Sequence, residues 1–388
     1  ADAEPNDGVT VLPSELDSAH SYGHVERTFS EFMLSDFGLP GGAPGSGTYA
    51  PEVFSTSLDN NHIARCQDCH MPDVAGKAAS QSKAVLRPEE SVEHPLSGVP
   101  SHDMTGGNVW VPWILASCDP NSPNYDAGNL AILGQGSNVL TLDLEAGLGL
   151  DPSSLLDAAD RAMANLQNAA TLEETEYEEL AHSLSFKILN HTGHKLLSGF
   201  PEGRRMWVNV RFYAQDDALI GEINPYDYDA GTMKGLPYAY ADPDSILPDP
   251  LPLSASERHA DELVYEMVPS STLTGEPHTF HFVLADGRYK DNRIPPKGFD
   301  SSAAAARLTQ PRWHGEDDLD YFTPEEYAGG YDEIEFAKPE GTVSWRAHLY
   351  YQTTSKEYVE FLRDEINGNN RTLESGTPEH PEDPYVAQ

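Results

Sequence analysis

Two stretches in the first half of the chain repeat apolar residues at the spacing of an amphipathic helix. Residues 22–34 and 155–172 both place apolar side chains three and four positions apart, which lines up one helix face. These positions are Val25, Phe29, Phe32 and Met33 in the first stretch and Leu156, Ala159, Met163 and Leu166 in the second. Residues 151–153, Asp-Pro-Ser, are typical of a helix start. We therefore expect a short helix in each, the first ended by the Gly- and Pro-rich residues 38–47.

Beyond residue 182 the apolar residues change from a helical to an alternating pattern. Four segments alternate in the two-residue manner of half-buried strands: residues 184–189, 206–213, 279–284 and 343–351. No long helical pattern separates these segments, so we expect them to pair in an antiparallel way. A β-sandwich is the architecture that matches such a series of strands.

These patterns predict an α+β protein with two domains. A chain of 388 residues is long enough for two domains that each bury a core. We expect a loop- and helix-rich region over residues 1–175, followed by an antiparallel β-sandwich-like domain over residues 176–388. Residues 224–252, rich in Asp, Pro and Tyr, are expected to form an acidic loop inserted between strands.

The chain is strongly acidic, with 24 Lys and Arg against 63 Asp and Glu and a formal net charge of −39. This excludes nucleic acid as a partner, because binding phosphates requires a cationic face. No window approaches the roughly 18–20 consecutive apolar residues of a transmembrane helix. Residues 1–5 show neither the basic nor the apolar region of a signal peptide, so we expect that such a peptide is absent or already removed.

The cysteines point to one site. Only three are present, Cys66, Cys69 and Cys118, which excludes a disulfide-dense scaffold. Cys66 and Cys69 stand in the sequence Cys-Gln-Asp-Cys-His, the pattern of covalent c-type haem attachment. Two thiols at this spacing can reach the two vinyl groups on one edge of a porphyrin, and the adjacent imidazole then reaches the iron. The motif predicts one haem c, attached through Cys66 and Cys69 and ligated by His70, with Cys118 as a buried apolar residue.

A redox-active disulfide and a structural zinc site are the alternatives for this motif. A thioredoxin-like pair would follow a strand, whereas residues 57–62 before the motif are polar and turn-like. A zinc site would need two further ligands, and no second C-x-x-C motif exists, although His191 and His194 are three apart. The five-residue pattern favours haem. Because covalent haem attachment takes place outside the cytoplasm, we expect a secreted protein that is periplasmic, extracellular or attached to the cell surface.

The second axial ligand of the iron would decide the chemistry. A second histidine would leave only outer-sphere electron transfer, whereas an open position would permit catalysis on a small ligand. His102 lies in a Gly-rich segment near Trp110 and Trp113, and His194 lies where the β domain could close over the haem. Both are candidate iron ligands. The alternatives are a turn histidine at position 102 and a histidine hydrogen-bonded to the backbone at position 194.

Two further groups of charged residues are candidate binding residues. Arg204 or Arg205 could pair with a haem propionate, because a guanidinium group binds a carboxylate in bidentate fashion. A salt bridge with one of the protein's own carboxylates is the alternative. The acidic loop supplies carboxylates that could hold Ca²⁺ but lack the ordered spacing of a calcium loop, so a solvated loop is favoured. These carboxylates are Asp227, Asp229, Asp242 and Asp244.

Several segments of the chain are also similar, in the same order, to segments of bacterial multihaem c-type cytochromes. They are residues 66–72 (CQDCHMP), 102–108 (HDMTGGN), 192–196 (TGHKL), 200–205 (FPEGRR), 291–299 (DNRIPPKGF), and 350–353 (YYQT) with 358–362 (YVEFL). The chain thus resembles this family over residues 20–362. The resemblance implies a secreted electron-transfer protein in which a haem region precedes a β-rich domain. This chain departs from the family in carrying a single C-x-x-C-H motif and in having Leu197 where relatives have proline.

We therefore expect an electron carrier, not an enzyme, that exchanges electrons with other cytochromes or redox proteins. A globule of this length has a radius of gyration of roughly 21 Å. A single haem must then work at an edge and pass its electron to a partner, in a homo-oligomer or filament where a histidine of one chain can ligate a neighbour's haem. One alternative is a haem enzyme with an open axial site. Another is a glycan- or surface-binding β module with exposed Tyr226, Tyr228, Tyr238 and Tyr240.

Overall fold

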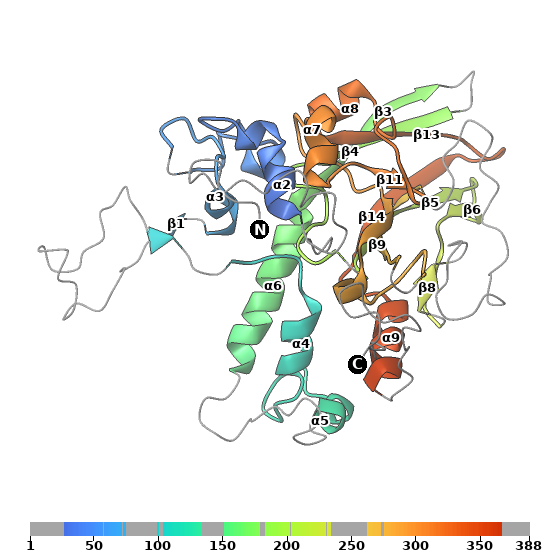
Figure 1. The fold of residues 1–388 in the computed structure, drawn as a ribbon. Helices are drawn as coiled ribbons and strands as arrows, with labels where there is room; N and C mark the ends of the chain where they lie inside the picture. Colours follow the sequence, from blue (N-terminus) through green and yellow to red (C-terminus); the bar gives the residue numbers. More distant parts are fainter. Residues whose placement is uncertain are drawn as a thin grey trace, which may run out of the picture. The chain divides into compact units, whose positions relative to one another are not determined.

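The computed structural model describes residues 27–56, 58–71, 73–74, 99–100, 104–133, 151–178, 183–201, 203–229, 231–233, 262–272 and 275–366. These residues form two compact units (Figure 1). The helical unit comprises the described residues from Phe37 to Ala170, and the sheet unit comprises those up to Asp36 and from Thr171 onward. Along the chain, the helical unit is therefore an insertion in the sheet unit.

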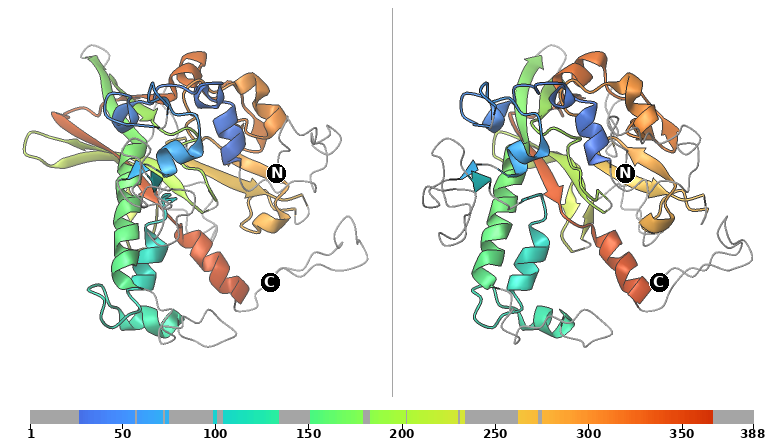
Figure 2. Two further views of the ribbon diagram at one scale, coloured as in Figure 1. Left: turned by 90° about the vertical axis from the view of Figure 1, so that its left-hand side faces the viewer. Right: turned by 60° about the vertical axis from the view of Figure 1, so that its left-hand side comes forward.

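The helical unit contains four α-helices among its described residues. They are α3 Cys66–His70, α4 Trp110–Ala116, α5 Ala127–Leu133 and α6 Pro152–Ala169, and β1 Asp73–Val74 pairs with β2 Val99–Pro100. Helix α4 lies beside α6 in all views (Figure 1 and Figure 2). Among the described residues, no helix combines the length and the apolar character needed to cross a bilayer.

Helix α6 confirms the second predicted helix, with a different end. The Asp151 carboxylate caps it by accepting the Ser153 N–H at 3.1 Å, as the sequence predicts. The predicted end at residue 172 is wrong, because the backbone becomes extended at Ala170 and continues as strand β3. Of the first predicted helix, residues 22–26 lie outside the described residues, and Thr28–Met33 form helix α2 of the sheet unit.

Antiparallel strands build the sheet unit, so the predicted α+β class with a β-rich C-terminal part is confirmed. One sheet of seven strands has the order β12-β11-β10-β9-β5-β14, with β6 also on β5, and a three-stranded sheet has the order β13-β4-β3. The longer strands are β3 Ala170–Glu178, β4 Ser183–Asn190, β5 Arg205–Tyr213, β6 Leu219–Ile223, β9 Val264–Ser270, β10 Gly287–Asp291, β13 Tyr331–Ala337 and β14 Ser344–Gln352. The two-residue strands are β7 Tyr226–Asp227, β8 Thr232–Met233, β11 Arg312–Trp313 and β12 Glu316–Asp317. Helices α7 Ser301–Ala304, α8 Pro324–Gly329 and α9 Lys356–Ile366 complete the unit.

The core of the sheet unit comes from alternating side chains of β4, β5 and β13. These side chains are at most 2% exposed, and they are Leu184, Phe186, Ile188, Val208, Val210, Phe212, Ile334 and Phe336. Phe212 of β5 meets Phe336 of β13 edge-on, with ring centroids 5.8 Å apart, and Phe186 of β4 stacks on Trp345 of β14 at 6.2 Å. The strands predicted over residues 184–189, 206–213 and 343–351 are therefore confirmed.

The strand predicted over residues 279–284 is wrong. Phe282–Leu284 form a 3₁₀ turn, and the residues before it lie in a bend. The apolar residues are used as separate anchors: Phe280 packs against Tyr358 and Phe361 of α9, and Phe282 packs edge-on against Phe200. The apolar residues alternate here because they contact a helix and a loop, and this spacing happens to resemble that of a strand.

A cluster of charged side chains lies inside the sheet unit. The Arg293 guanidinium donates to Asp291 Oδ1 at 2.8 Å and to Glu31 Oε1 at 2.9 Å. Arg288 Nη1 lies 2.5 Å from Asp291 Oδ2, and Lys195 contacts the same carboxylate. All five side chains are at most 5% exposed. Because Glu31 belongs to α2, this cluster ties the segment before the helical unit to the sheets that follow it.

Candidate haem attachment site

The C-x-x-C-H motif forms a single turn of helix, α3. Its start is held by Asp68, whose Oδ2 accepts the backbone N–H groups of Ala64 at 2.9 Å and Arg65 at 3.0 Å. The Arg65 guanidinium adds an ion pair to Asp68 Oδ1 at 3.0 Å. In a helical turn, residues at positions i, i+3 and i+4 lie on one face. Helix α3 therefore presents Cys66, Cys69 and His70 to the same side.

The two thiols of the motif differ in exposure. Cys66 is exposed, and Cys69 is partly buried. Burial, with smaller contributions from the charges of Asp68 and Cys66, raises the pKa of Cys69 to about 12. The pKa of a redox-active or metal-binding thiolate is lowered by its surroundings, so this environment does not resemble that of a catalytic disulfide pair.

One hydrogen bond fixes the imidazole of His70. Its Nδ1 lies 2.8 Å from the backbone oxygen of Thr105. A carbonyl oxygen only accepts, so Nδ1 carries the proton and Nε2 carries the lone pair of the neutral ring. This is the tautomer that binds a metal through Nε2, and a carbonyl partner on the other nitrogen is typical of metal-bound histidines. Two thiols and this imidazole on one face fit the three bonds that a c-type haem makes with its motif.

Two further side chains support the Thr105 carbonyl. Asn165 of α6 donates from Nδ2 to this oxygen at 3.3 Å, and the Tyr49 hydroxyl donates to Asn165 Oδ1 at 3.2 Å. Burial, with a smaller contribution from the charge of Cys69, raises the pKa of Tyr49 to about 12. The three residues that hold His70 in place directly or indirectly, Thr105, Asn165 and Tyr49, come from distant parts of the chain. No local spacing in the sequence marks them, and sequence reasoning missed all three.

The two histidines predicted as second iron ligands are placed as follows. His102 lies outside the described residues. His194 belongs to the sheet unit, and its Nδ1 donates to the backbone oxygen of Lys195 at 2.9 Å. This contact corresponds to the backbone-bonded alternative and also sets the tautomer with its lone pair on Nε2. The role of either histidine toward iron stays a prediction.

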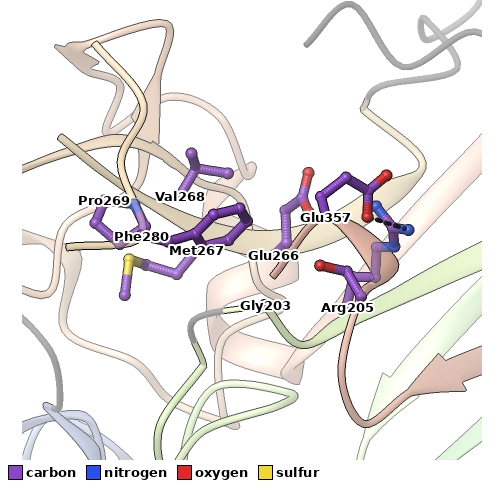
Figure 3. Close-up of a pocket in the computed structure, with 9 residues that line it drawn as sticks. Gly203, Arg205, Glu266, Met267, Val268, Pro269, Phe280 and Glu357 are labelled. Atoms are coloured by element: carbon purple, nitrogen blue, oxygen red, sulfur yellow. Dashed lines mark hydrogen bonds and ion pairs between the residues drawn. The ribbon is translucent and has the colours of Figure 1, made fainter. Parts of the chain in front are cut away.

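The two candidate arginines both have partners within the sheet unit. Arg205 Nε donates to Gln352 Oε1 at 2.7 Å, and its Nη2 lies 3.3 Å from Glu357 Oε2, where both ion-pair side chains are at most 6% exposed. This pair lines one end of a cavity against β9 (Figure 3). Arg204 donates from Nη1 to the Gly199 oxygen at 2.7 Å. The contact of Arg205 is the salt bridge weighed as an alternative, and a propionate contact for either residue stays a prediction.

The predicted calcium carboxylates are only partly described. Asp227 and Asp229 lie at the β7–β8 turn, where Asp227 Oδ1 accepts the Asp229 N–H at 3.0 Å. Asp242 and Asp244 lie outside the described residues. Within the part of the chain that the structure describes, no group of three or more His, Cys, Asp or Glu side chains is arranged to hold a metal ion. A c-type haem iron takes one ligand from its motif, so it does not require such a group.

Comparisons with known proteins give little for this chain. No family model matches it, and no curated protein matches it. Among solved structures, a penta-heme cytochrome c552 from Thermochromatium tepidum is similar at 12% identity and a TM-score of 0.29. The likeness covers 58% of this chain and 39% of that chain, so less than half of the other protein is matched. At this TM-score the likeness carries no argument about fold or function.

Proposed function

We propose that this protein is a c-type cytochrome that carries one covalently attached haem and transfers electrons to or from partner redox proteins. The observation that carries this proposal is helix α3, which presents two thiols and His70 on one face. The Nδ1 hydrogen bond to Thr105 sets the His70 tautomer required of an axial ligand. When bound, the haem supplies the one-electron chemistry, and the chain supplies the attachment, the ligand and the surroundings that set its potential.

The proposal includes a location and an assembly. Covalent haem attachment places the protein in the periplasm, outside the cell or on its surface. One haem cannot carry an electron across a globule with a radius of gyration of roughly 21 Å, so a partner haem close to the surface completes the path. The partner is another cytochrome or a second copy of this chain. The two sheets of the sheet unit form a sandwich in this proposal, which the Phe212–Phe336 and Phe186–Trp345 contacts support.

Covalent attachment is tested with cysteine variants. The protein is expressed in cells that attach haem c, and haem content is measured after denaturation by pyridine haemochrome absorbance and intact mass. The wild type and Cys118→Ser should each retain one haem, since the Cys118 thiol lies outside the motif. Cys66→Ser and Cys69→Ser together should release it. A wild-type protein that binds zinc, or that carries no haem after denaturation, would refute the proposal.

Electron transfer is separated from catalysis by the axial coordination. Optical and low-temperature EPR spectra of the holoprotein are recorded in both oxidation states, with and without carbon monoxide. A low-spin iron that does not bind carbon monoxide indicates two protein ligands and an electron carrier. A high-spin iron that binds carbon monoxide would contradict the electron-carrier proposal and support a haem enzyme. His194→Ala then shows whether that side chain is the second ligand, because its loss would change the spin state.

A further inference from the structure

A second pocket lies on the sheet unit, where the β7–β8 hairpin meets strands β5 and β14. It contains about 390 Å³ of space not occupied by protein atoms, part of it open to solvent. The lining side chains include Trp207, Asn209, Arg211, Tyr226, Tyr228 and Tyr350.

The alternation of β5 creates this pocket. Val208, Val210 and Phe212 point to the buried core, so the intervening residues point to the opposite face of the sheet. Tyr350 of β14 is the direct cross-strand neighbour of Trp207 and shares its face. The pocket is therefore built on rigid paired strands, with the β7–β8 hairpin as its wall.

Aromatic rings supply most of the pocket surface. Trp207 and Tyr226 are stacked with centroids 5.5 Å apart, and Tyr350 lies 5.4 Å from Trp207 on a tilted plane. Tyr228 contacts Tyr226 edge-on at 5.1 Å and is 80% exposed. The Tyr226 hydroxyl is held by the Gln352 side-chain amide at 3.0 Å. An exposed ring beside fixed aromatic neighbours offers a flat apolar platform to a ligand.

Among the residues that the structure describes, two buried polar atoms of the pocket lining have no hydrogen-bond partner. They are Trp207 Nε1, a donor, and Asn209 Oδ1, an acceptor, on side chains that are 6% and 2% exposed. The Asn209 amide cannot simply be reversed, because its Nδ2 donates to Glu222 Oε1 at 2.8 Å and to the Ile223 oxygen at 2.9 Å. Buried polar groups in native proteins nearly always have hydrogen-bond partners, so we expect a bound molecule to supply a partner for each of these two atoms.

Charge narrows the ligand class. Arg211 Nε lies 2.7 Å from Glu222 Oε1, so this pair compensates itself, and the other residues named above as lining the pocket are neutral. An anion would find no uncompensated cation in that set, and a quaternary ammonium would meet the Arg211 guanidinium. A neutral ligand that both donates and accepts hydrogen bonds fits these conditions.

We propose that this pocket binds the ring of a neutral sugar. The apolar C–H face of a pyranose stacks on the exposed Tyr228, and a single hydroxyl can accept from one group and donate to another. Both atoms are covered by the lining side chains, so a small shift of those side chains lets the sugar hydroxyls supply an acceptor for Trp207 Nε1–H and a donor for Asn209 Oδ1. This site lies on the sheet unit and is independent of the proposed haem.

Binding is tested on the full-length protein with free sugars. Glucose, galactose, N-acetylglucosamine and their β-1,4-linked dimers are titrated at millimolar concentrations, using isothermal calorimetry and saturation-transfer NMR. We expect at least one of them to bind with a millimolar or lower Kd. Tyr228→Ala should weaken binding about tenfold by removing the platform. Trp207→Phe keeps an aromatic ring but removes the donor and should weaken binding about three- to tenfold.

A control variant and a comparison of polymeric with free sugar complete the test. Tyr125→Ala removes a tyrosine that is 42% exposed in the helical unit and should leave binding unchanged. Retardation in gels that contain a soluble polysaccharide, compared with binding of the free sugar, distinguishes a polymer from a metabolite. Absence of binding by every probe would overturn the proposal. So would equal binding by Tyr228→Ala, or a crystal structure in which ordered waters satisfy Trp207 and Asn209 and remain in place at millimolar sugar.

Discussion

Lys195 Nζ lies 3.0 Å from Asp291 Oδ2, and neither side chain is more than 1% exposed. The two residues come from segments almost a hundred positions apart, 192–196 and 291–299. The carboxylates of Glu31 and Asp291 meet three cations, those of Lys195, Arg288 and Arg293. The cluster is thus one positive charge in excess when all five groups are ionised.

The pKa of Lys195 makes stability depend on pH. Burial lowers this pKa to about 8, from an unperturbed 10.5, although Asp291 opposes the shift. Between these values the unfolded chain binds a proton that the folded chain does not, so the free energy of unfolding should rise with pH. The rise can reach about 1.4 kcal/mol per pH unit. Urea unfolding is followed from about pH 7 to 10 for the wild type and for Lys195→Met. The free energy of unfolding should rise with pH in the wild type alone. Parallel curves would contradict the lowered pKa.

Removal of Arg293 should strongly destabilise the sheet unit. Arg293→Met leaves Glu31 without its ion pair and takes one cation from Asp291, in a place that water does not reach. Loss of one partner of a buried ion pair costs about 3–5 kcal/mol. Arg363→Met is the matched control, because Arg363 is 58% exposed and lies 3.8 Å from Glu360. Its loss should cost less than about 1 kcal/mol in chemical denaturation. Equal losses would show that the Arg293 contacts do not stabilise the fold.

Two glycines with the same backbone conformation should respond differently to alanine. Gly298 has φ of +70° and Gly199 has φ of +69°. A Cβ on Gly298 would overlap the Asp36 carboxylate, whereas a Cβ on Gly199 would meet no atom within 4 Å. Gly199→Ala should therefore cost only the left-handed conformation, about 1–2 kcal/mol. Gly298→Ala should cost a further 1–3 kcal/mol or so for the overlap. Thermal unfolding of both variants measures the difference, and equal values would show that Asp36 moves freely aside.

Asn165 should influence the reduction potential of an attached haem. Its Nδ2 shares the Thr105 oxygen with His70 Nδ1, so Asn165→Leu leaves that carbonyl to the imidazole. A stronger hydrogen bond raises the basicity of His70 and favours ferric iron. For a hydrogen bond of about 0.5–1 kcal/mol, the potential should fall by about 20–40 mV. Spectroelectrochemical titration measures this, with Asn168→Leu on the same helix as the control. A potential that does not move would show that the Asn165 contact is only structural.

The sequence predicts strands where apolar and polar residues alternate without interruption, as in β4, β5 and β14. It fails at β13, where the buried position at the start of the alternation is Asp332. The structure pairs this carboxylate with the Tyr265 hydroxyl of β9, a contact that no local pattern announces. Strand β9 was missed for a related reason. Six of its seven residues are buried, so its burial does not alternate, and Glu266 is balanced there by Lys290 at 3.1 Å.

The residues of the candidate haem site also fall into those that the sequence predicts and those that it does not. Cys66, Cys69 and His70 are adjacent in sequence, and one helical turn is enough to bring them together. Thr105 and Asn165 reach His70 only through the tertiary fold, and their spacing carries no period. Arg205 also has a partner that no local pattern predicts, because Glu357 lies 152 positions later in the chain and meets it in the folded sheet unit.

The insertion of the helical unit into the sheet unit sets an order of events during synthesis. Helix α2 is synthesised before the helical unit, but its Glu31 can pair with Arg293 only after a further 262 residues have been made. The contacts of His70 with Thr105, and of Thr105 with Asn165, are complete as soon as residue 170 has emerged. A chain made from its N-terminus onward can therefore finish the helical unit while the sheet unit still lacks most of its strands. The thiols of α3 thus belong to a unit whose own contacts can form before the sheet unit closes around its ion cluster.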